Sequence, residues 1–163
     1  MIELSSLNPF EYEYGGEAYE FTTSAGVSYQ VSFLDYSQVI ELNTPTYMLC
    51  ISRYVPNGAI LIYDKRIEET IIHILNKFFS NNQNVLVTIN DVNDSKQHAR
   101  ARLFNSWFNK YNNGNIRKLE GEVRIDSEEE IFSRALLLYS VNNDNEKEIV
   151  DQFNILLYNN FYN

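Results

Sequence analysis

The chain has few of the residues that cross-link or break a fold. Its 163 residues include one cysteine, three prolines and six glycines. A lone cysteine excludes an internal disulfide framework and a cysteine-based zinc site, and it fits a reducing cytoplasm. Because Cys50 lies in an apolar run, we interpret it as a small buried hydrophobe. The scarcity of proline and glycine argues against a chain built from linkers or low-complexity segments.

Basic charge and long apolar runs are also lacking. The chain carries 13 lysines and arginines against 22 aspartates and glutamates, a net charge of −9. Duplex nucleic acid and anionic membranes repel such a surface, whereas a basic protein partner is compatible with it. No stretch approaches the roughly 18 apolar residues of a membrane-spanning helix, and the N-terminus has no basic, apolar leader. We therefore expect a cytoplasmic protein that does not associate with membranes.

The common catalytic signatures are missing. There is no glycine-rich phosphate loop, no dinucleotide fingerprint, no nucleophile elbow and no His-Glu-x-x-His sequence. His73 has no second metal-type residue one turn away on its helix face, so we expect it to be exposed or at the edge of the core and not to be a metal ligand. The sequence predicts no cofactor and no metal. It favours binding over catalysis as the mode of action, with a small enzyme as the alternative.

The most informative stretch covers residues 84–111. Residues 85–89 form a continuous, β-branched-rich apolar run, which is typical of a strand covered on both faces. The polar cluster 90–95 ends this strand, and Asp94 or Ser95 can cap the helix that follows. The helix is predicted over residues 95–111. Its apolar side carries Ala99, Leu103, Phe104, Trp107, Phe108 and Tyr111.

A charged side chain interrupts the apolar side of this predicted helix. Arg100 projects among the apolar residues, so its guanidinium must either extend past the start of the helix into solvent or meet an acceptor. Asp91 and Asp94 are the nearest candidate acceptors in the sequence. Two interpretations follow: a structural Arg–Asp lock, or an anion or ligand site beside the helix N-terminus. His98 and Arg102 lie one turn apart on the opposite, exposed face. The five residues Asp91, Asp94, His98, Arg100 and Arg102 are the candidate site.

Residues 94–108 resemble the signature of a family of small bacterial proteins of unknown function. In that family a helix carrying Arg-x-Arg-x-Phe-x-x-Trp-Phe follows a strand that ends in aspartate, and here residues 100–108 carry this pattern. The Phe-Thr-Thr sequence at residues 21–23 and the Tyr-Ser sequence at residues 139–140 are similar as well. The resemblance implies a compact domain and brings no activity with it.

The rest of the chain mixes strands and helices without regular alternation. Residues 17–23 and 27–34 predict a hairpin, and residues 66–80 predict an amphipathic helix capped by Asp64. Further predicted elements are strands at residues 47–54, 59–63, 116–125 and 130–141 and a helix at residues 144–162, after an irregular stretch at residues 1–16. This order predicts a single α+β domain over residues 1–163. Its one mixed, mostly antiparallel sheet has about five to six strands, with three helices packed on it.

Two functional hypotheses remain. The first is a small acidic protein that binds another protein, for instance in a bacterial or phage defence, counter-defence or toxin-neutralising system; this setting rests on the resemblance and on the composition. Its aromatic-rich ends supply candidate partner contacts at Phe10, Tyr12, Tyr14, Tyr158 and Tyr162. An open sheet edge would also allow a homodimer. The second hypothesis is a small enzyme or ligand sensor with a polar site at residues 91–102.

Overall fold

One mixed sheet organises the molecule. A computed structural model describes residues 4–89, 97–126 and 131–162, with side chains over residues 5–89, 102–123 and 133–157. The strands follow the spatial order β1-β2-β3-β4-β5-β7-β6. They are β1 (Glu13–Tyr14), β2 (Ala18–Thr22), β3 (Ser28–Asp35), β4 (Thr46–Tyr54), β5 (Val85–Ile89), β6 (Ile116–Asp126) and β7 (Ile131–Ser140). All neighbouring strands are antiparallel except β4 and β5, which are parallel.

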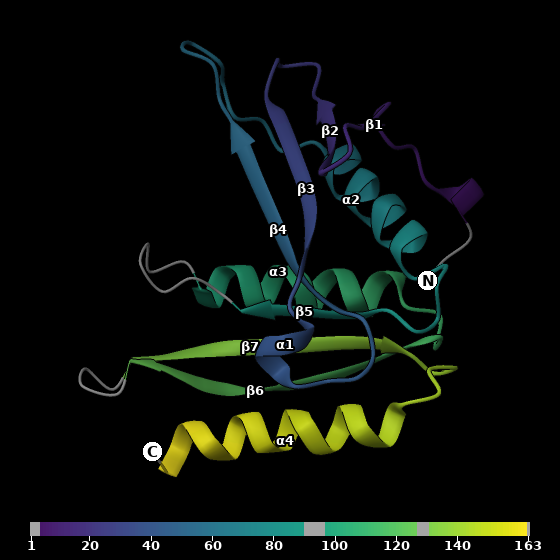
Figure 1. The fold of residues 1–163 in the computed structure, drawn as a ribbon. Helices are drawn as coiled ribbons and strands as arrows, with labels where there is room; N and C mark the ends of the chain where they lie inside the picture. Colours follow the sequence, from purple (N-terminus) through teal and green to yellow (C-terminus); the bar gives the residue numbers. More distant parts are fainter. Residues whose placement is uncertain (1–3, 90–96, 127–130, 163) are drawn as a thin grey trace.

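Helices cover both faces of this sheet (Figure 1). They are α1 (Ser37–Ile40), α2 (Lys65–Phe78), α3 (Gln97–Tyr111) and α4 (Glu146–Tyr162), and a short 3-10 helix spans Leu4–Ser6. On one face α2 and α3 pack over the sheet, where Trp107 joins a core with Leu86. On the other face α1 and α4 form a second core, where Phe153 meets Val87. Because β5 is buried from both sides, its apolar run needs no polar alternation.

The sheet opens between β4 and β5. Their ladder covers three residue pairs only, from Thr46–Val85 to Met48–Val87. Beyond Met48, β4 continues beside β3 as far as Tyr54, while β5 follows β7 to Ile89. In Figure 1 the strands β2, β3 and β4 rise steeply away from β5, β7 and β6. The two halves of the sheet therefore diverge, and the wedge between them lies beside α2 and α3.

The N-terminal segment is fastened along α2. The backbone N–H of Phe10 donates to Thr70 Oγ1 at 2.9 Å, and the guanidinium of Arg66 donates to the carbonyls of Asn8 and Pro9. The same guanidinium lies 4.0 Å from the centre of the Phe10 ring. Within the described part of the predicted irregular stretch at residues 1–16, the 3-10 helix and the two-residue β1 are regular, and the other residues lie in no helix or strand. A segment held by scattered side-chain contacts has no periodic signal in the sequence.

On the opposite face, α4 lies very close to β6. A Cβ atom added to Gly121 on β6 would come within 2.6 Å of both Cδ atoms of Leu157 on α4. Real Cβ contacts do not reach this distance, so the glycine lets the helix approach the strand. Gly121 is thus a packing residue, and its position sets how closely α4 covers the sheet.

The α+β class and the mixed, mostly antiparallel sheet are confirmed, and the element counts need correction. The described residues contain seven strands and four α-helices, more than the five to six strands and three helices predicted. The two-residue β1 and the four-residue α1 are too short to show a period. Residues 59–63, predicted as a strand, pair with nothing among the described residues and carry no regular structure.

Candidate functional site

A cleft of about 880 Å³ occupies the wedge where β4 and β5 separate. The strand β4 forms one wall from Met48 to Arg53, and α2 and α3 form the opposite side with Ile67, Ile71 and Trp107. Most lining side chains are apolar, and the residues 61–64 form part of the rim. This volume lies within the range of small-molecule binding pockets. We call this feature the β4–β5 cleft.

Glu68 joins the two helices beside the cleft. Glu68 is buried, with 8% of the residue exposed, and its carboxylate accepts hydrogen bonds from three α3 side chains. Trp107 Nε1 donates at 2.9 Å, and Lys110 Nζ and the Tyr111 hydroxyl each donate at 2.5 Å. We call these four residues the Glu68 cluster. Because every donor converges on one carboxylate, the cluster fixes how far α2 and α3 stand apart.

The charges of this cluster stabilise one another. Burial alone raises the pKa of Glu68, but the hydrogen bonds from Lys110, Tyr111 and Trp107 outweigh it and hold that pKa below its usual value. The bond to Glu68 raises the pKa of Lys110, while burial followed by the bond to Glu68 raises that of Tyr111. At neutral pH the carboxylate is therefore ionised, and both of its oxygens accept hydrogen bonds. Its bond to the indole N–H holds Trp107 at the cleft wall.

Thr88 adds an unusual polar group to the cleft. Its residue is 5% exposed, and its hydroxyl has no hydrogen-bond partner among the described residues. It borders the cleft near the end of β5. A buried hydroxyl without a partner destabilises a folded protein by about 1–3 kcal/mol, so native structures rarely retain one. Such a group beside a cleft is well placed to bond an incoming ligand.

An exposed apolar segment forms the outer rim. Ile60, Leu61, Ile62 and Tyr63 are between 52% and 78% exposed, and we call them the apolar strip. Three of them, Leu61, Ile62 and Tyr63, line the cleft. Four consecutive large apolar side chains in solvent are uncommon on a protein that acts alone, and such surfaces mark interaction sites. The strip therefore extends the apolar lining of the cleft onto the surface.

The sequence of this chain matches the model of a known family. Residues 63–155 match the model of a family of unknown function, DUF6169. The chain belongs to the DUF6169 family. The match confirms the expectation of an uncharacterised family. No curated protein and no solved structure matches the sequence.

The DUF6169 match covers only part of the cleft. Its range, residues 63–155, contains α2, β5 and α3, and hence the Glu68 cluster and Thr88. It leaves out β4 and most of the apolar strip, which form the other wall and the rim. None of the helices in the described part of this DUF6169 chain is long and apolar enough to cross a membrane.

The junction predicted from the sequence adjoins the cleft. Ile89, at the end of β5, and Leu103 and Phe104 on α3 all line it. Asp91 and Asp94 lie outside the described residues, and the side chains of His98 and Arg100 on α3 do as well. Arg102 is exposed to solvent. The proposed meeting of Arg100 with an aspartate therefore stays a prediction.

The aromatic residues near the N-terminus differ in their exposure. Phe10 is 6% exposed and stacks on Phe21 in the core, which corrects its assignment as a partner contact. Tyr12 is half-buried, and its hydroxyl shares a 2.6 Å hydrogen bond with Nδ1 of His73. Tyr14 is exposed and donates to the carbonyl of Gly16. The side chains of Tyr158 and Tyr162 lie outside the described part.

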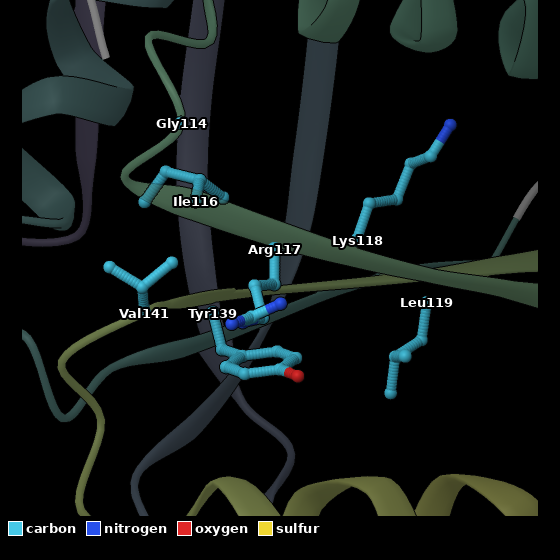
Figure 2. Close-up of a pocket in the computed structure, with 7 residues that line it drawn as sticks. All are labelled: Gly114, Ile116, Arg117, Lys118, Leu119, Tyr139 and Val141. Carbon is cyan, nitrogen blue, oxygen red and sulfur yellow. The ribbon is translucent and has the colours of Figure 1, made fainter.

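A second, shallower hollow of about 400 Å³ lies at β6 and β7. Figure 2 shows the side chains of Arg117 and Tyr139 together on the α4 side of β6, with Lys118 pointing to the opposite side. Arg117 Nε lies 2.9 Å from a Glu146 carboxylate oxygen, and the Tyr139 hydroxyl donates to the same carboxylate at 3.1 Å. These polar groups satisfy one another, so the hollow is a structural junction between the sheet and α4.

Sequence reasoning missed β4 and the apolar strip as parts of a site. The run at residues 59–63 is apolar, which favours a strand, although it lacks the alternation of a half-buried strand. That missing alternation, directly after the turn at residues 56–58, was the available signal. The cleft itself depends on a parallel pairing between strands about 40 residues apart, as the Thr46–Val85 pair shows, and no local pattern reports such a pairing.

Proposed function

We propose that this chain is a binding module that acts by protein–protein interaction, with the β4–β5 cleft and the apolar strip as its docking surface. The observation that supports this most directly is the exposed apolar strip continuing into an apolar cleft. Binding would remove this surface from water, which is the dominant favourable term in protein association. The net charge of −9 favours a partner of opposite charge, because long-range attraction speeds encounter.

The biological setting that the sequence suggests is compatible with this function. A small acidic protein of the cytoplasm, in a bacterial or phage defence, counter-defence or toxin-neutralising system, would act by occupying a surface of its target. The Glu68 cluster supports such a role, because it holds α2 and α3 in place beside the cleft before any partner arrives. A preformed surface loses less conformational entropy on binding.

The test compares two variants that add the same charge to exposed apolar residues. Ile62→Glu changes the apolar strip, and Val39→Glu changes α1 on the other face; both residues are well exposed. The tagged full chain is purified from its native host, and co-purified proteins are quantified by mass spectrometry. We expect a stoichiometric partner with wild type and Val39→Glu that is lost with Ile62→Glu. Purification of the chain alone, or a partner retained equally by Ile62→Glu, would count against the proposal.

A ligand sensor is the second candidate. The volume of the cleft and the unbonded hydroxyl of Thr88 favour it, since a small apolar molecule with one polar group would satisfy both. Its test is a thermal-shift screen of the purified chain, including nucleotides and divalent metals, because the sequence predicts a polar site at residues 91–102. A shift abolished by Thr88→Val but preserved in Ile62→Glu would favour the sensor over the protein-binding module.

A further inference from the structure

We infer that the partner docks in the β4–β5 cleft as an extended strand, hydrogen-bonded to the free edge of β4. This inference rests on the proposed function, because it requires a protein partner. It adds the binding mode and the chemistry of the segment that binds. The partner segment is extended, carries apolar side chains at alternate positions, and belongs to a protein of net basic charge.

The backbone of β4 has a free edge inside the cleft. The carbonyl of Pro45 accepts from the N–H of Val85 at 2.8 Å, while that of Thr46 accepts from Tyr36 at 2.7 Å. The backbone N–H and C=O groups of odd-numbered β4 residues thus point toward β5, and those of even-numbered residues point toward β3. The register of β3 with β4 runs without a shift through Tyr54, so this alternation continues.

The consequence concerns two residues beyond the last β4–β5 pair. The backbone N–H and C=O groups of Ile51 and Arg53 point toward the opening, where β5 no longer runs alongside. No other described residue supplies them with a hydrogen bond. An unpaired strand edge is a ready template for another strand, and strand addition is an established mode of peptide recognition.

The free edge of β4 and the outer edge of the sheet at β6 differ in their protection. The outer edge strand β6 carries a dense row of charges, with Arg117, Lys118, Glu120 and Glu122 in its first seven residues. Charged side chains on an edge strand discourage pairing with other chains. The free stretch of β4 from residue 49 to residue 52 contains no charge, and Arg53 is the first. The β4 edge thus lacks the protection that β6 has.

The walls of the cleft fit a single extended strand. Leu61 and Ile62 of the apolar strip lie along the rim, and Phe104 and Trp107 of α3 line the cleft with β4. Because side chains of a strand alternate between two faces, one set would contact the strip and the other would contact α3. A polar side chain or backbone group of the strand would bond the hydroxyl of Thr88, which has no partner among the described residues.

The same geometry argues against a second copy of this chain as the occupant. The apolar strip and α3 line the cleft together with β4, so a second copy would have to bring its own β4, with the same two segments around it, into this cleft. Two copies with a net charge of −9 would also repel. A narrow peptide segment from a basic partner meets neither obstacle.

The test uses peptides selected on the full chain from a displayed library of random sequences about twelve residues long, which is enough for one strand. Affinities are then compared for Arg53→Ala and Arg53→Pro. Both variants lose the guanidinium, and only proline also removes the N–H that faces the cleft. We expect the proline variant to bind about threefold to tenfold more weakly than the alanine variant, the effect of losing one backbone hydrogen bond.

Amide hydrogen exchange on the wild-type chain provides a readout that needs no variant. Bound peptide should protect the amides of Ile51 and Arg53, with little change at Ser52, whose amide already faces β3. A library that yields no binder, or binders that leave Ile51 and Arg53 unprotected, would overturn strand addition. In another outcome, peptides bind Arg53→Pro and Arg53→Ala with equal affinity and yet bind Ile62→Glu more weakly than wild type. That result would contradict strand addition and would still support the proposed function. A concentration-dependent dimer abolished by Arg53→Pro would identify a second copy as the occupant.

Discussion

The indole N–H of Trp107 donates to the carboxylate of Glu68 at 2.9 Å, and this bond ties α3 to α2 beside the β4–β5 cleft. Trp107 was predicted as part of the apolar side of its helix, and it is buried there. The carboxylate opposite it comes from a helix 39 residues earlier in the chain. The wall of the proposed docking surface thus depends on a charge buried between two helices.

Removal of that charge should destabilise the fold. Glu68→Gln keeps the shape of the side chain but turns one acceptor oxygen into a donor, so Trp107 or the pair Lys110 and Tyr111 loses its partner. We expect the free energy of unfolding to fall by about 2 kcal/mol, because hydrogen bonds to charged groups contribute this much. Chemical denaturation measures it. Glu122→Gln, at an exposed carboxylate on β6, is the control and should change little; an equal loss in both variants would contradict the role of Glu68.

The same carboxylate predicts a pH dependence. The pKa of Glu68 is lowered in the folded state from its ordinary value of 4.5. Its contribution to stability is therefore fully present above about pH 4.5 and is lost as the pH falls through the folded-state pKa. The difference in unfolding free energy between wild type and Glu68→Gln should shrink on acidification below that value. Glu69 and Asp35, whose pKa values are also lowered, are present in both proteins and cancel. A difference that stays constant down to about pH 3 would refute the assignment.

Thr88→Val should stabilise the free protein and weaken binding. Valine has nearly the shape of threonine without the hydroxyl, so it removes the polar atom that has no partner among the described residues. We expect a gain of about 1 kcal/mol in the free energy of unfolding. Thr46→Val is the matched control, because the Thr46 hydroxyl is buried and donates to the carbonyl of Thr44 at 3.0 Å. Thermal or chemical unfolding should show opposite signs for the two variants. A loss of stability in both would mean that the Thr88 hydroxyl has a partner in the folded chain.

Gly121→Ala should destabilise the packing of α4 on β6. The added methyl group would meet the Cδ atoms of Leu157 at 2.6 Å, so the helix or the leucine must move. Overpacking of this kind destabilises by about 1–3 kcal/mol. A double-mutant cycle checks the cause: in a Leu157→Ala background the same substitution should have a much smaller effect. If the loss is equal in both backgrounds, the close approach to Leu157 does not explain it.

Strong local patterns were predicted well. The buried strand at residues 85–89 and the helix predicted over residues 66–80 are observed as β5 and α2, and Asp64 caps α2 by accepting from the N–H of Arg66 at 2.9 Å. These elements could be predicted because hydrophobic periodicity and helix capping involve residues only a few positions apart in the sequence.

The site was not predictable in the same way. The β4–β5 cleft arises where a parallel pairing stops after three residues, and Glu68 meets Trp107 only after α2 and α3 have packed. Both relationships join distant parts of the chain, so no local period reports them. Residues on both sides of the predicted junction, Ile89 and Leu103, line this cleft. The contact of Arg100 with Asp91 or Asp94 remains a prediction.

The central claim is that a protein partner occupies the β4–β5 cleft. Amide hydrogen exchange of the full chain, free and bound to the partner recovered with it, tests this most directly. Binding should protect the amides of residues 49–54 and of the apolar strip at residues 60–63, and should leave exchange in α1 on the other face unchanged. Protection confined to α1, α4 or the outer edge of β6, with exchange unaltered at residues 49–54 and 60–63, would contradict it.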